Sequence, residues 1–253
     1  MSAFAKWIFY SLFGTMTVVL LITLISQSYS GNDQRVLVKK SPRTVKAVTS
    51  HYSVAVDQRL KPWFDKAQVQ YPPQKISLLA FKKEQRLELW AMQSSAWVLI
   101  RQYNFTASSG VLGPKLKEGD KQIPEGLYKI SGLNPNSSYH LSMKINYPND
   151  FDLRYALKEG RQNPGSNIFI HGRNKSIGCI ALGDVAIEEL FVLVATIGQK
   201  DVPVIVAPWD FRKKKLNTLV IPVNVRKKWL KGLYKTIDSK LKAYPLTAAT
   251  PTG

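Results

Sequence analysis

Cysteine and histidine are both scarce in this chain of 253 residues. Cys179 is the only cysteine, and the three histidines are His51, His140 and His171. A single thiol cannot form an internal disulfide, which excludes the disulfide-stapled frameworks of small secreted domains. A structural zinc site takes about four ligands and a catalytic one about three, and beside His171 and Cys179 only His51 and His140 remain as nitrogen donors, with no second cysteine, so a metal site is disfavoured. We therefore expect no metal ion and no cofactor.

Acidic residues are also in short supply, with 17 Asp and Glu against 36 Lys and Arg, a formal net charge of +19. Such a basic chain is expected to bind a polyanion. The candidates are nucleic acid, an anionic membrane surface and an acidic cell-wall polymer. Hydrophobic residues still make up 45% of the chain, enough for a packed core. The length suits one sizeable domain with extensions, or two small domains.

The stretch Trp7–Ile25 carries no charged residue. A helix of this length, at about 1.5 Å per residue, just crosses a hydrocarbon core of about 30 Å. It is longer than the usual signal-peptide core of about 7–15 residues, yet Ser28-Tyr29-Ser30 resembles a cleavage site. Residues 1–30 are therefore interpreted as a membrane anchor or a cleaved signal segment, with a buried soluble helix as a third possibility. Either of the first two exports the chain to the periplasmic face of the cell envelope, which argues against nucleic acid as a partner.

Strand patterns dominate the middle of the chain. Residues 31–74 are expected to be a linker and an N-terminal extension, with a short helix that packs through Val54, Leu60, Phe64 and Ala67. Apolar alternation and turn residues then predict strands at 76–81, 87–92, 97–103, 127–130, 139–148, 167–172 and 202–211. The run after Cys179 predicts a helix with Asp184 as its N-cap. Because strands and helices do not alternate regularly, we expect a mainly β domain with flanking helices (α+β) over 75–210.

Residues 211–253 form a basic C-terminal extension. Trp229, Leu230, Leu233, Ile237 and Leu241 recur at helical spacing, with lysines mostly between them. A stripe of this kind usually packs on its own domain. The alternative is a helix that lies on a membrane surface.

The candidate active site is the run IFIHGRNKSIGCIALGD, in which His171 precedes Cys179 by eight positions. A thiol with a pKa near 8.5 is only about 3% thiolate at neutral pH, and a neighbouring imidazole or a helix N-terminus raises that fraction. His171 ends a predicted strand, and a predicted helix follows Cys179. We therefore expect a nucleophile, Cys179, activated by a general base, His171, with backbone N–H groups around Gly178 available to an oxyanion.

Other polar residues near the pair have less definite roles. The group that orients His171 is left open between the hydroxyl of Ser176 and a backbone carbonyl near Gly172. His140 lies in a predicted strand and is interpreted as a residue of its polar face. His51 borders a flexible region and indicates little.

The run IHG…SIGCIAL resembles the active-site motif of the L,D-transpeptidase catalytic domain, or YkuD domain. That motif has His-Gly, a spacer, then Ser-His-Gly-Cys, an apolar residue and usually Arg. Here Ile177 replaces the second histidine and Ala181 replaces the arginine, departures that match the YafK-like branch of the family. The upstream text GPKLKEGDKQIPEGLYKISGLNPNSSYHLSMKINYPNDFD also resembles that branch, so the resemblance spans roughly residues 75–210.

The resemblance implies a β-rich, exported enzyme of cell-wall biogenesis, with Cys179 at the mouth of a groove and peptidoglycan stem peptides as substrate. Cys179 would attack the carbonyl of the L-centre of diaminopimelate, and His171 would act as base and then as acid. An amine acceptor would then give a crosslink. Some YafK-like members are thought instead to cut the amide that joins peptidoglycan to a lipoprotein, which is the first alternative.

Two other cysteine enzymes fit the sequence poorly. An NlpC/P60-type peptidase has its cysteine before its histidine, the reverse of the order here. A sortase separates the pair by far more chain and needs an arginine after the cysteine. The remaining alternative is a catalytically inert wall-binding protein, which the net charge and the two replaced motif positions favour.

Overall fold

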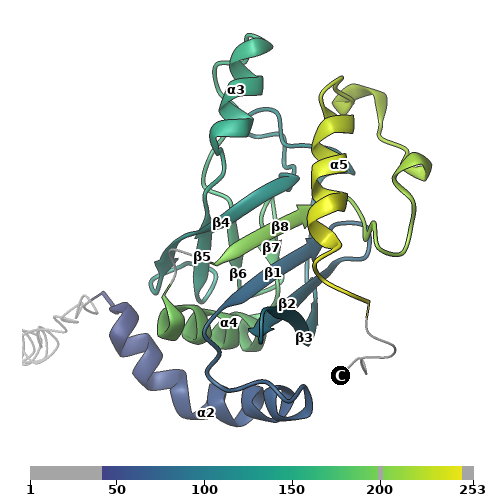
Figure 1. The fold of residues 1–253 in the computed structure, drawn as a ribbon. Coiled ribbons are helices and arrows are strands. Elements are labelled where there is room, and N and C mark those ends of the chain that lie inside the picture. The colour runs from purple at the N-terminus through teal and green to yellow at the C-terminus, as the bar shows by residue number, and fades with distance from the viewer. Residues whose placement is uncertain (1–41, 199–201, 247–253) are drawn as a thin grey trace, which may run out of the picture. The chain divides into compact units, whose positions relative to one another are not determined.

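The computed structural model describes residues 42–198 and 202–246. The expected anchor or signal segment over residues 1–30, including the apolar run 7–25, lies outside these ranges. Within them, no helix combines the length and the apolar character needed to span a bilayer. The described chain is an α+β fold built on a single sheet (Figure 1).

The sheet has eight strands in the order β3-β2-β1-β8-β4-β5-β6-β7. Their bounds are β1 Ile76–Phe81, β2 Arg86–Gln93, β3 Ala96–Asn104, β4 Gly126–Asn134, β5 Ser142–Ile145, β6 Phe169–His171, β7 Ile180–Ala181 and β8 Pro203–Ala207. Neighbouring strands are antiparallel except for the parallel pairs β1/β8 and β6/β7. The predicted hairpin of β1 and β2, with β3 as the third strand, is confirmed. β5 is shorter than predicted because His140 has a φ of +73°, which is incompatible with a strand.

β1 is buried along its whole length because both of its faces are covered, and Ser77 is its one polar residue. Leu78 and Ala80 point into a core shared with the helices on one side of the sheet, whereas Leu79 and Phe81 point into a second core on the other side. Side chains alternate between the two faces of a strand, so a nearly continuous apolar run fills both cores. β8 pairs with β1 and β4 and so lies inside the sheet, although it is the last strand in the sequence.

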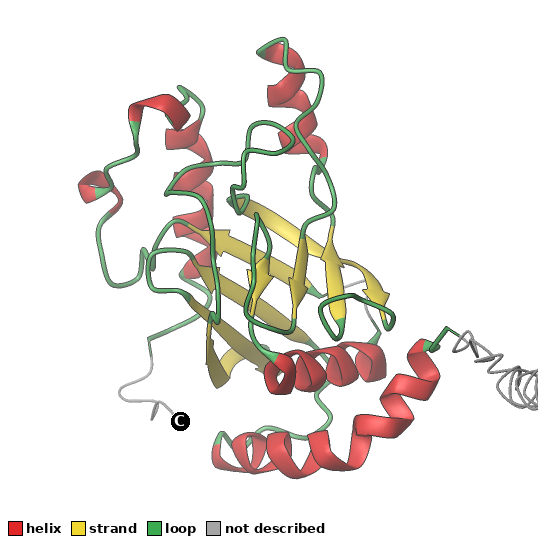
Figure 2. Cartoon of the chain, turned by 180° about the vertical axis from the view of Figure 1, so that it is seen from behind, coloured by secondary structure: helices red, strands yellow, loops and turns green. Residues whose placement is uncertain are grey.

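Four α-helices accompany the sheet: α2 Val45–Lys66, α3 Asp150–Lys158, α4 Asp184–Ile197 and α5 Leu230–Leu241. α2 and α4 pack together on one side (Figures 1 and 2). α2 begins inside the expected linker because the Thr44 hydroxyl caps it by accepting from Ala47 N. The expected contact through Val54 is wrong, since that side chain is 67% exposed, whereas Leu60 and Phe64 are buried as predicted.

α4 is held in place by a buried carboxylate. Glu189 is fully buried and accepts hydrogen bonds from Arg59 of α2 and from Arg101 and Tyr103 of β3, at 2.9–3.0 Å. A buried charge is tolerated only when it is paired in this way. The ionic cluster therefore joins α2, α4 and the sheet in one fixed arrangement.

α5 covers the opposite side of the sheet. Leu230, Leu233, Ile237 and Leu241 are buried against residues of β1, β2 and β8. The interpretation of this stripe as packed on its own domain is confirmed, and its alternative role as an apolar face in a membrane surface is wrong. The lysines Lys228, Lys231, Lys235 and Lys242 are exposed.

Candidate functional site

Strand pairing brings His171 and Cys179, which are eight positions apart in sequence, to the same part of the sheet. β6 ends at His171, and β7 begins directly after Cys179. The two strands pair in parallel, with His171 opposite Ala181 and Ile170 opposite Ile180. The intervening segment, residues 172–179, therefore forms a loop that returns the chain beside the strand it left. His171 and Cys179 line the same cavity of about 350 Å³.

His171 is held in a defined orientation. Its ring Nδ1 lies 2.6 Å from the Gly172 carbonyl oxygen, and only 2% of the residue is exposed. Because a carbonyl can only accept, Nδ1 carries the proton and the lone pair is on Nε2. The Tyr139 ring packs against the imidazole, with 4.6 Å between centroids. Of the two orienting groups that the sequence left open, the backbone carbonyl is the one in contact with His171.

Burial favours the uncharged forms of both His171 and Cys179. Burial lowers the pKa of His171, although the hydrogen bond with Gly172 opposes this shift. Burial also raises the pKa of Cys179, against a backbone hydrogen bond from Phe169 and the positive charge of Lys115. Desolvation disfavours the charged form of each group, so burial opposes the rise in thiolate fraction that the sequence led us to expect from a neighbouring imidazole.

The helix N-terminus does not supply the expected activation. α4 begins at Asp184, and β7 lies between that residue and Cys179. The predicted N-cap is also wrong by one residue, because Gly183 occupies the cap position. The Asp184 carboxylate instead accepts from Arg173 N at 2.8 Å, which fixes the start of the loop after His171.

Ser176 organises the loop around the nucleophile. Its hydroxyl donates to the Cys179 carbonyl at 2.7 Å and accepts from Gly178 N at 3.3 Å. Gly178 has a φ of +121°, and a Cβ there would lie 3.2 Å from the Gln122 carbonyl oxygen. Only glycine fits this backbone conformation without strain. Gly172 is equally confined, since a Cβ would lie 2.6 Å from Asp184 Oδ1.

Lys115 is a site residue that the sequence did not single out. It lines the cavity, and its side chain is only 4% exposed. Its ammonium donates to Asp120 Oδ1 at 2.7 Å and to the Lys117 carbonyl at 3.0 Å, which uses two of its three hydrogens. Lys115 lies in a turn-rich segment between two predicted strands, and nothing in that sequence indicates that this lysine is buried. The position of Tyr139 before β5 likewise does not indicate its contact with His171.

The other histidines lie outside the cavity. His140 Nε2 is 2.8 Å from Glu188 Oε1, and the ring packs edge-on against Tyr52. His51 is exposed and contacts Tyr52. Among residues 42–198 and 202–246, no group of three or more His, Cys, Asp or Glu side chains is arranged to hold a metal ion.

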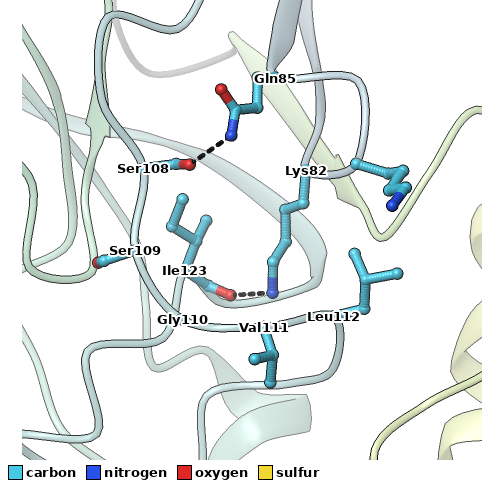
Figure 3. Close-up of a pocket in the computed structure, with 9 residues that line it drawn as sticks. Lys82, Gln85, Ser108, Ser109, Gly110, Val111, Leu112 and Ile123 are labelled. Carbon is cyan, nitrogen blue, oxygen red and sulfur yellow. Dashed lines mark hydrogen bonds between the residues drawn. The ribbon is translucent and has the colours of Figure 1, made fainter.

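A second hollow, of about 240 Å³, lies beside Lys82 (Figure 3). The Lys82 ammonium donates to the Gly113 and Ile123 carbonyls at 2.7 and 2.9 Å and pairs with Glu125 at 2.9 Å. All three of its hydrogens are thus engaged within the protein. Gln85 and Ser108, which face each other across the same hollow, are bonded at 3.1 Å. The Lys82 ammonium therefore fixes the segment that carries Lys115. It has no hydrogen left to donate to a ligand.

Comparison with known proteins identifies one family. The L,D-transpeptidase catalytic domain, YkuD, matches residues 76–215. Over 134 residues the chain is 34% identical to YafK of Escherichia coli strain K12, a protein named as an L,D-transpeptidase, and to YafK of strain O157:H7. Each alignment covers 51% of this chain and 52% of the relative, so the chain spans about half the length of the curated relatives it matches.

Solved structures with partial similarity include two from other bacteria. The helical cell shape determining protein Pgp2 of Campylobacter jejuni is 19% identical, with a TM-score of 0.44, over 73% of this chain and 77% of that one. L,D-transpeptidase 1 of Mycobacterium tuberculosis is 12% identical, with a TM-score of 0.32, over 53% and 62% of the two chains.

Proposed function

Because the chain belongs to the L,D-transpeptidase catalytic domain (YkuD) family, we propose that it is a cysteine-dependent acyltransferase that acts on peptidoglycan stem peptides. The observation that carries this proposal is the pairing of β6 with β7, which brings His171 and Cys179 to one cavity. His171 has its lone pair on Nε2, the state that a general base requires.

In the acylation step, Cys179 Sγ attacks the carbonyl of the L-centre of diaminopimelate in a tetrapeptide stem. The thiol proton passes to His171 Nε2 as the sulfur–carbon bond forms. The tetrahedral intermediate then collapses, the carbon–nitrogen bond breaks, and His171 returns the proton to the leaving amine of D-Ala. The product is a thioester on Cys179. An uncharged Cys179 and His171 are compatible with these reaction steps, because charge develops on the two side chains only as the substrate reacts.

The oxyanion of the intermediate requires donors next to the sulfur. The backbone N–H groups of Cys179 and Gly178 are the candidates. Gly178 N makes a long bond of 3.3 Å to the Ser176 hydroxyl, and this bond would be exchanged for one to the oxyanion. Ser176 would keep its shorter bond to the Cys179 carbonyl and so hold the loop in place.

The charge of the cavity supports an anionic substrate. Lys115, Lys121 and Lys175 line it, together with the single carboxylate of Glu118. Glu118 already accepts from Ser166 N at 3.0 Å. A stem peptide carries free carboxylates, and an ammonium in a partly desolvated wall attracts them more strongly than one in open water.

The fate of the thioester decides the overall reaction. An amine of a second stem would give a crosslink, and water would give hydrolysis. The amide between diaminopimelate and a peptidoglycan-linked lipoprotein follows the same L-centre, so the same acyl-enzyme would serve for its release. We place the enzyme at the periplasmic face of the cell envelope, with the uncharged run of residues 7–25 as a membrane anchor or signal segment.

Product analysis tests the proposal. Purified protein is incubated with disaccharide-tetrapeptide muropeptides and, separately, with peptidoglycan bearing its lipoprotein, and the products are identified by mass spectrometry. Loss of D-Ala with a new diaminopimelate crosslink is expected. Loss of D-Ala without crosslinks, or release of lipoprotein, would indicate a hydrolase with the same acyl-enzyme. If no substrate changes and the protein still sediments with peptidoglycan, it is a wall-binding protein and the proposed chemistry is wrong. Cys179→Ala is the control for contaminating activity.

A further inference from the structure

The C-terminal part of the chain concentrates positive charge far beyond the average of the protein. Residues 211–240 contain ten Lys and Arg and one acidic residue, Asp238, whereas the whole chain has 36 against 17. Two of the ten are engaged elsewhere: Arg212 pairs with Glu88 and Asp210, and Lys227 lies 3.7 Å from Glu159. Most of the others, including Lys213–Lys215, Lys228, Lys231 and Lys235, are exposed. This surface plays no part in the site around Cys179.

These charges surround a groove of about 680 Å³ between residues 216–221 and α5. We call it the basic groove. Its apolar wall is formed by Leu216, Leu219, Ile221, Leu230 and Tyr234, and its cationic rim by Arg226, Lys227, Lys231 and Lys235. The basic groove and the catalytic cavity share no residue.

Two aliphatic side chains project from the same segment. Val220 is 76% exposed and Val223 is 81% exposed, among the most exposed large apolar residues of the described chain. Val220 also lines the basic groove. Exposed valines next to an apolar groove with a cationic rim are an amphipathic surface, and such surfaces bind at a membrane interface.

We propose that the basic groove and its two exposed valines bind the surface of an anionic phospholipid membrane. The lysines would meet lipid phosphates, Val220 and Val223 would enter the interfacial layer, and the groove would take an acyl chain or glycerol backbone. A soluble polyanion accounts for the lysines but not for the apolar wall and the exposed valines. An uncharged apolar ligand accounts for the wall but not for a rim that holds three cations besides the paired Lys227. Both features together match an anionic amphiphile.

This proposal differs from the earlier alternative in which the apolar stripe of α5 lies on a membrane. That stripe is buried against the sheet. It is also independent of the uncharged run at residues 7–25. The test must therefore report on the basic groove itself and not on attachment of the whole chain.

A local fluorescent probe meets this requirement. In the full chain with Cys179→Ala, Val223→Cys is labelled with an environment-sensitive fluorophore. Vesicles of phosphatidylcholine alone are compared with vesicles containing about one third phosphatidylglycerol. We expect a blue shift, and quenching by lipid-borne nitroxides, only with the anionic vesicles. The same label on Val54→Cys, which is 67% exposed on α2, is expected not to respond.

Charge variants complete the test. Lys231→Gln with Lys235→Gln should weaken engagement of the probe by about thirtyfold, at about tenfold per 1.4 kcal/mol and about 1 kcal/mol per cation at an anionic surface. The matched pair Lys46→Gln with Lys66→Gln, exposed lysines of α2, should leave it unchanged. A silent Val223 probe, an equal response at Val54, or no effect of the Lys231 and Lys235 changes would overturn the proposal. So would a Val223 response to soluble inorganic polyphosphate that vesicles fail to produce.

Discussion

At the scale of single residues, the central feature is that His171 and Cys179 line one cavity and that burial shifts both toward their uncharged forms. Burial raises the pKa of Cys179 and lowers that of His171. Burial thus lowers the resting thiolate fraction, and in the reaction we propose the thiolate forms as His171 takes the proton. A low thiolate fraction would protect a lone thiol from oxidation and alkylation, because those reactions require the thiolate.

The neutral pair predicts an unreactive resting thiol. Alkylation of Cys179 by iodoacetamide should be slower at neutral pH than that of a free cysteine peptide, and its rate should rise only above the ordinary pKa of a thiol. Catalysis needs neutral His171, and the lowered pKa keeps it neutral below its ordinary value of 6.5, so kcat/KM should persist below that pH. Both profiles come from stopped assays across pH. Rapid alkylation with a midpoint below the ordinary thiol value would instead indicate a thiolate–imidazolium pair.

Lys115 is expected to assist catalysis by its charge. Its ammonium lowers the pKa of Cys179, so Lys115→Met should move the alkylation profile to higher pH. We expect kcat/KM to fall between about threefold and thirtyfold, less than the ~10²–10³ typical of a direct oxyanion donor. Asp120 keeps hydrogen bonds from three backbone N–H groups, those of Leu116, Lys117 and Gln122, so the loop should stay folded.

Lys121→Met is the matched control, because Lys121 lines the same cavity from an exposed position where water screens its charge. Its pH profile should match the wild type. If both variants shift equally, or if Lys115→Met lowers activity without moving the pH profile, Lys115 has a purely structural role.

At the scale of elements, the strands with a clear local pattern were predictable. β1 follows from a short apolar run, and β2 to β4 follow from alternation and turn residues. The extent of α2 was not predictable, because its start depends on the Thr44 cap and its position on contacts with α4 far along the chain. The central place of β8 depends on long-range pairing, which local sequence does not encode.

The buried Glu189 cluster is predicted to stabilise the packing of α2 and α4 on the sheet. Glu189→Ala leaves the Tyr103 hydroxyl and two arginines without their shared acceptor. We expect a loss of roughly 3 kcal/mol in the free energy of unfolding, near the low end for a broken buried pair because Arg59 and Arg101 are partly exposed. Urea denaturation followed by circular dichroism measures it.

Asp65→Ala provides the comparison for that loss. Asp65 pairs with Lys61 at 2.7 Å on the surface of α2, with both side chains more than half exposed. Removing an exposed pair of this kind should cost less than about 0.5 kcal/mol. Equal losses in the two variants would mean that burial of Glu189 does not determine its contribution.

At the scale of the whole molecule, both faces of the sheet are covered in part by helices outside the family-matched region. Residues 76–215 contain the whole sheet and α4, but neither α2 nor α5. These two helices cover opposite faces of the sheet (Figures 1 and 2). The boundaries expected for the catalytic domain, 75–210, enclose His171 and Cys179 but exclude α2 and α5, because the resemblance rests on the motif residues and not on the helices that pack around them.

This dependence predicts that fragment 76–215 does not fold alone. Without α2 and α5, buried residues such as Phe81, Trp90 and Leu78 would face water, and large exposed apolar patches cause aggregation. A fragment of residues 42–246 should unfold cooperatively in urea, whereas fragment 76–215 should be insoluble or show no cooperative transition. Cooperative unfolding of fragment 76–215 with the same free energy would show that the helices are dispensable.

The proximity of His171 and Cys179 to one cavity was the part of the candidate site that the sequence predicted best, because both residues belong to one short motif. Tyr139 and Lys115 were missed because they reach the cavity from segments more than thirty residues away in sequence. Their contribution depends on burial and on the course of the chain, neither of which a motif records.

Intact-protein mass spectrometry after an acid quench tests the central claim most directly. Wild-type protein mixed with a disaccharide-tetrapeptide should gain the mass of the muropeptide less D-Ala, and peptide mapping should place the adduct on Cys179. Cys179→Ala should gain nothing, and His171→Ala should gain almost nothing because His171 is the only imidazole among the described residues that line the cavity. An adduct that persists in Cys179→Ala, or a His171→Ala protein that acylates at the wild-type rate, would contradict the assignment of this pair.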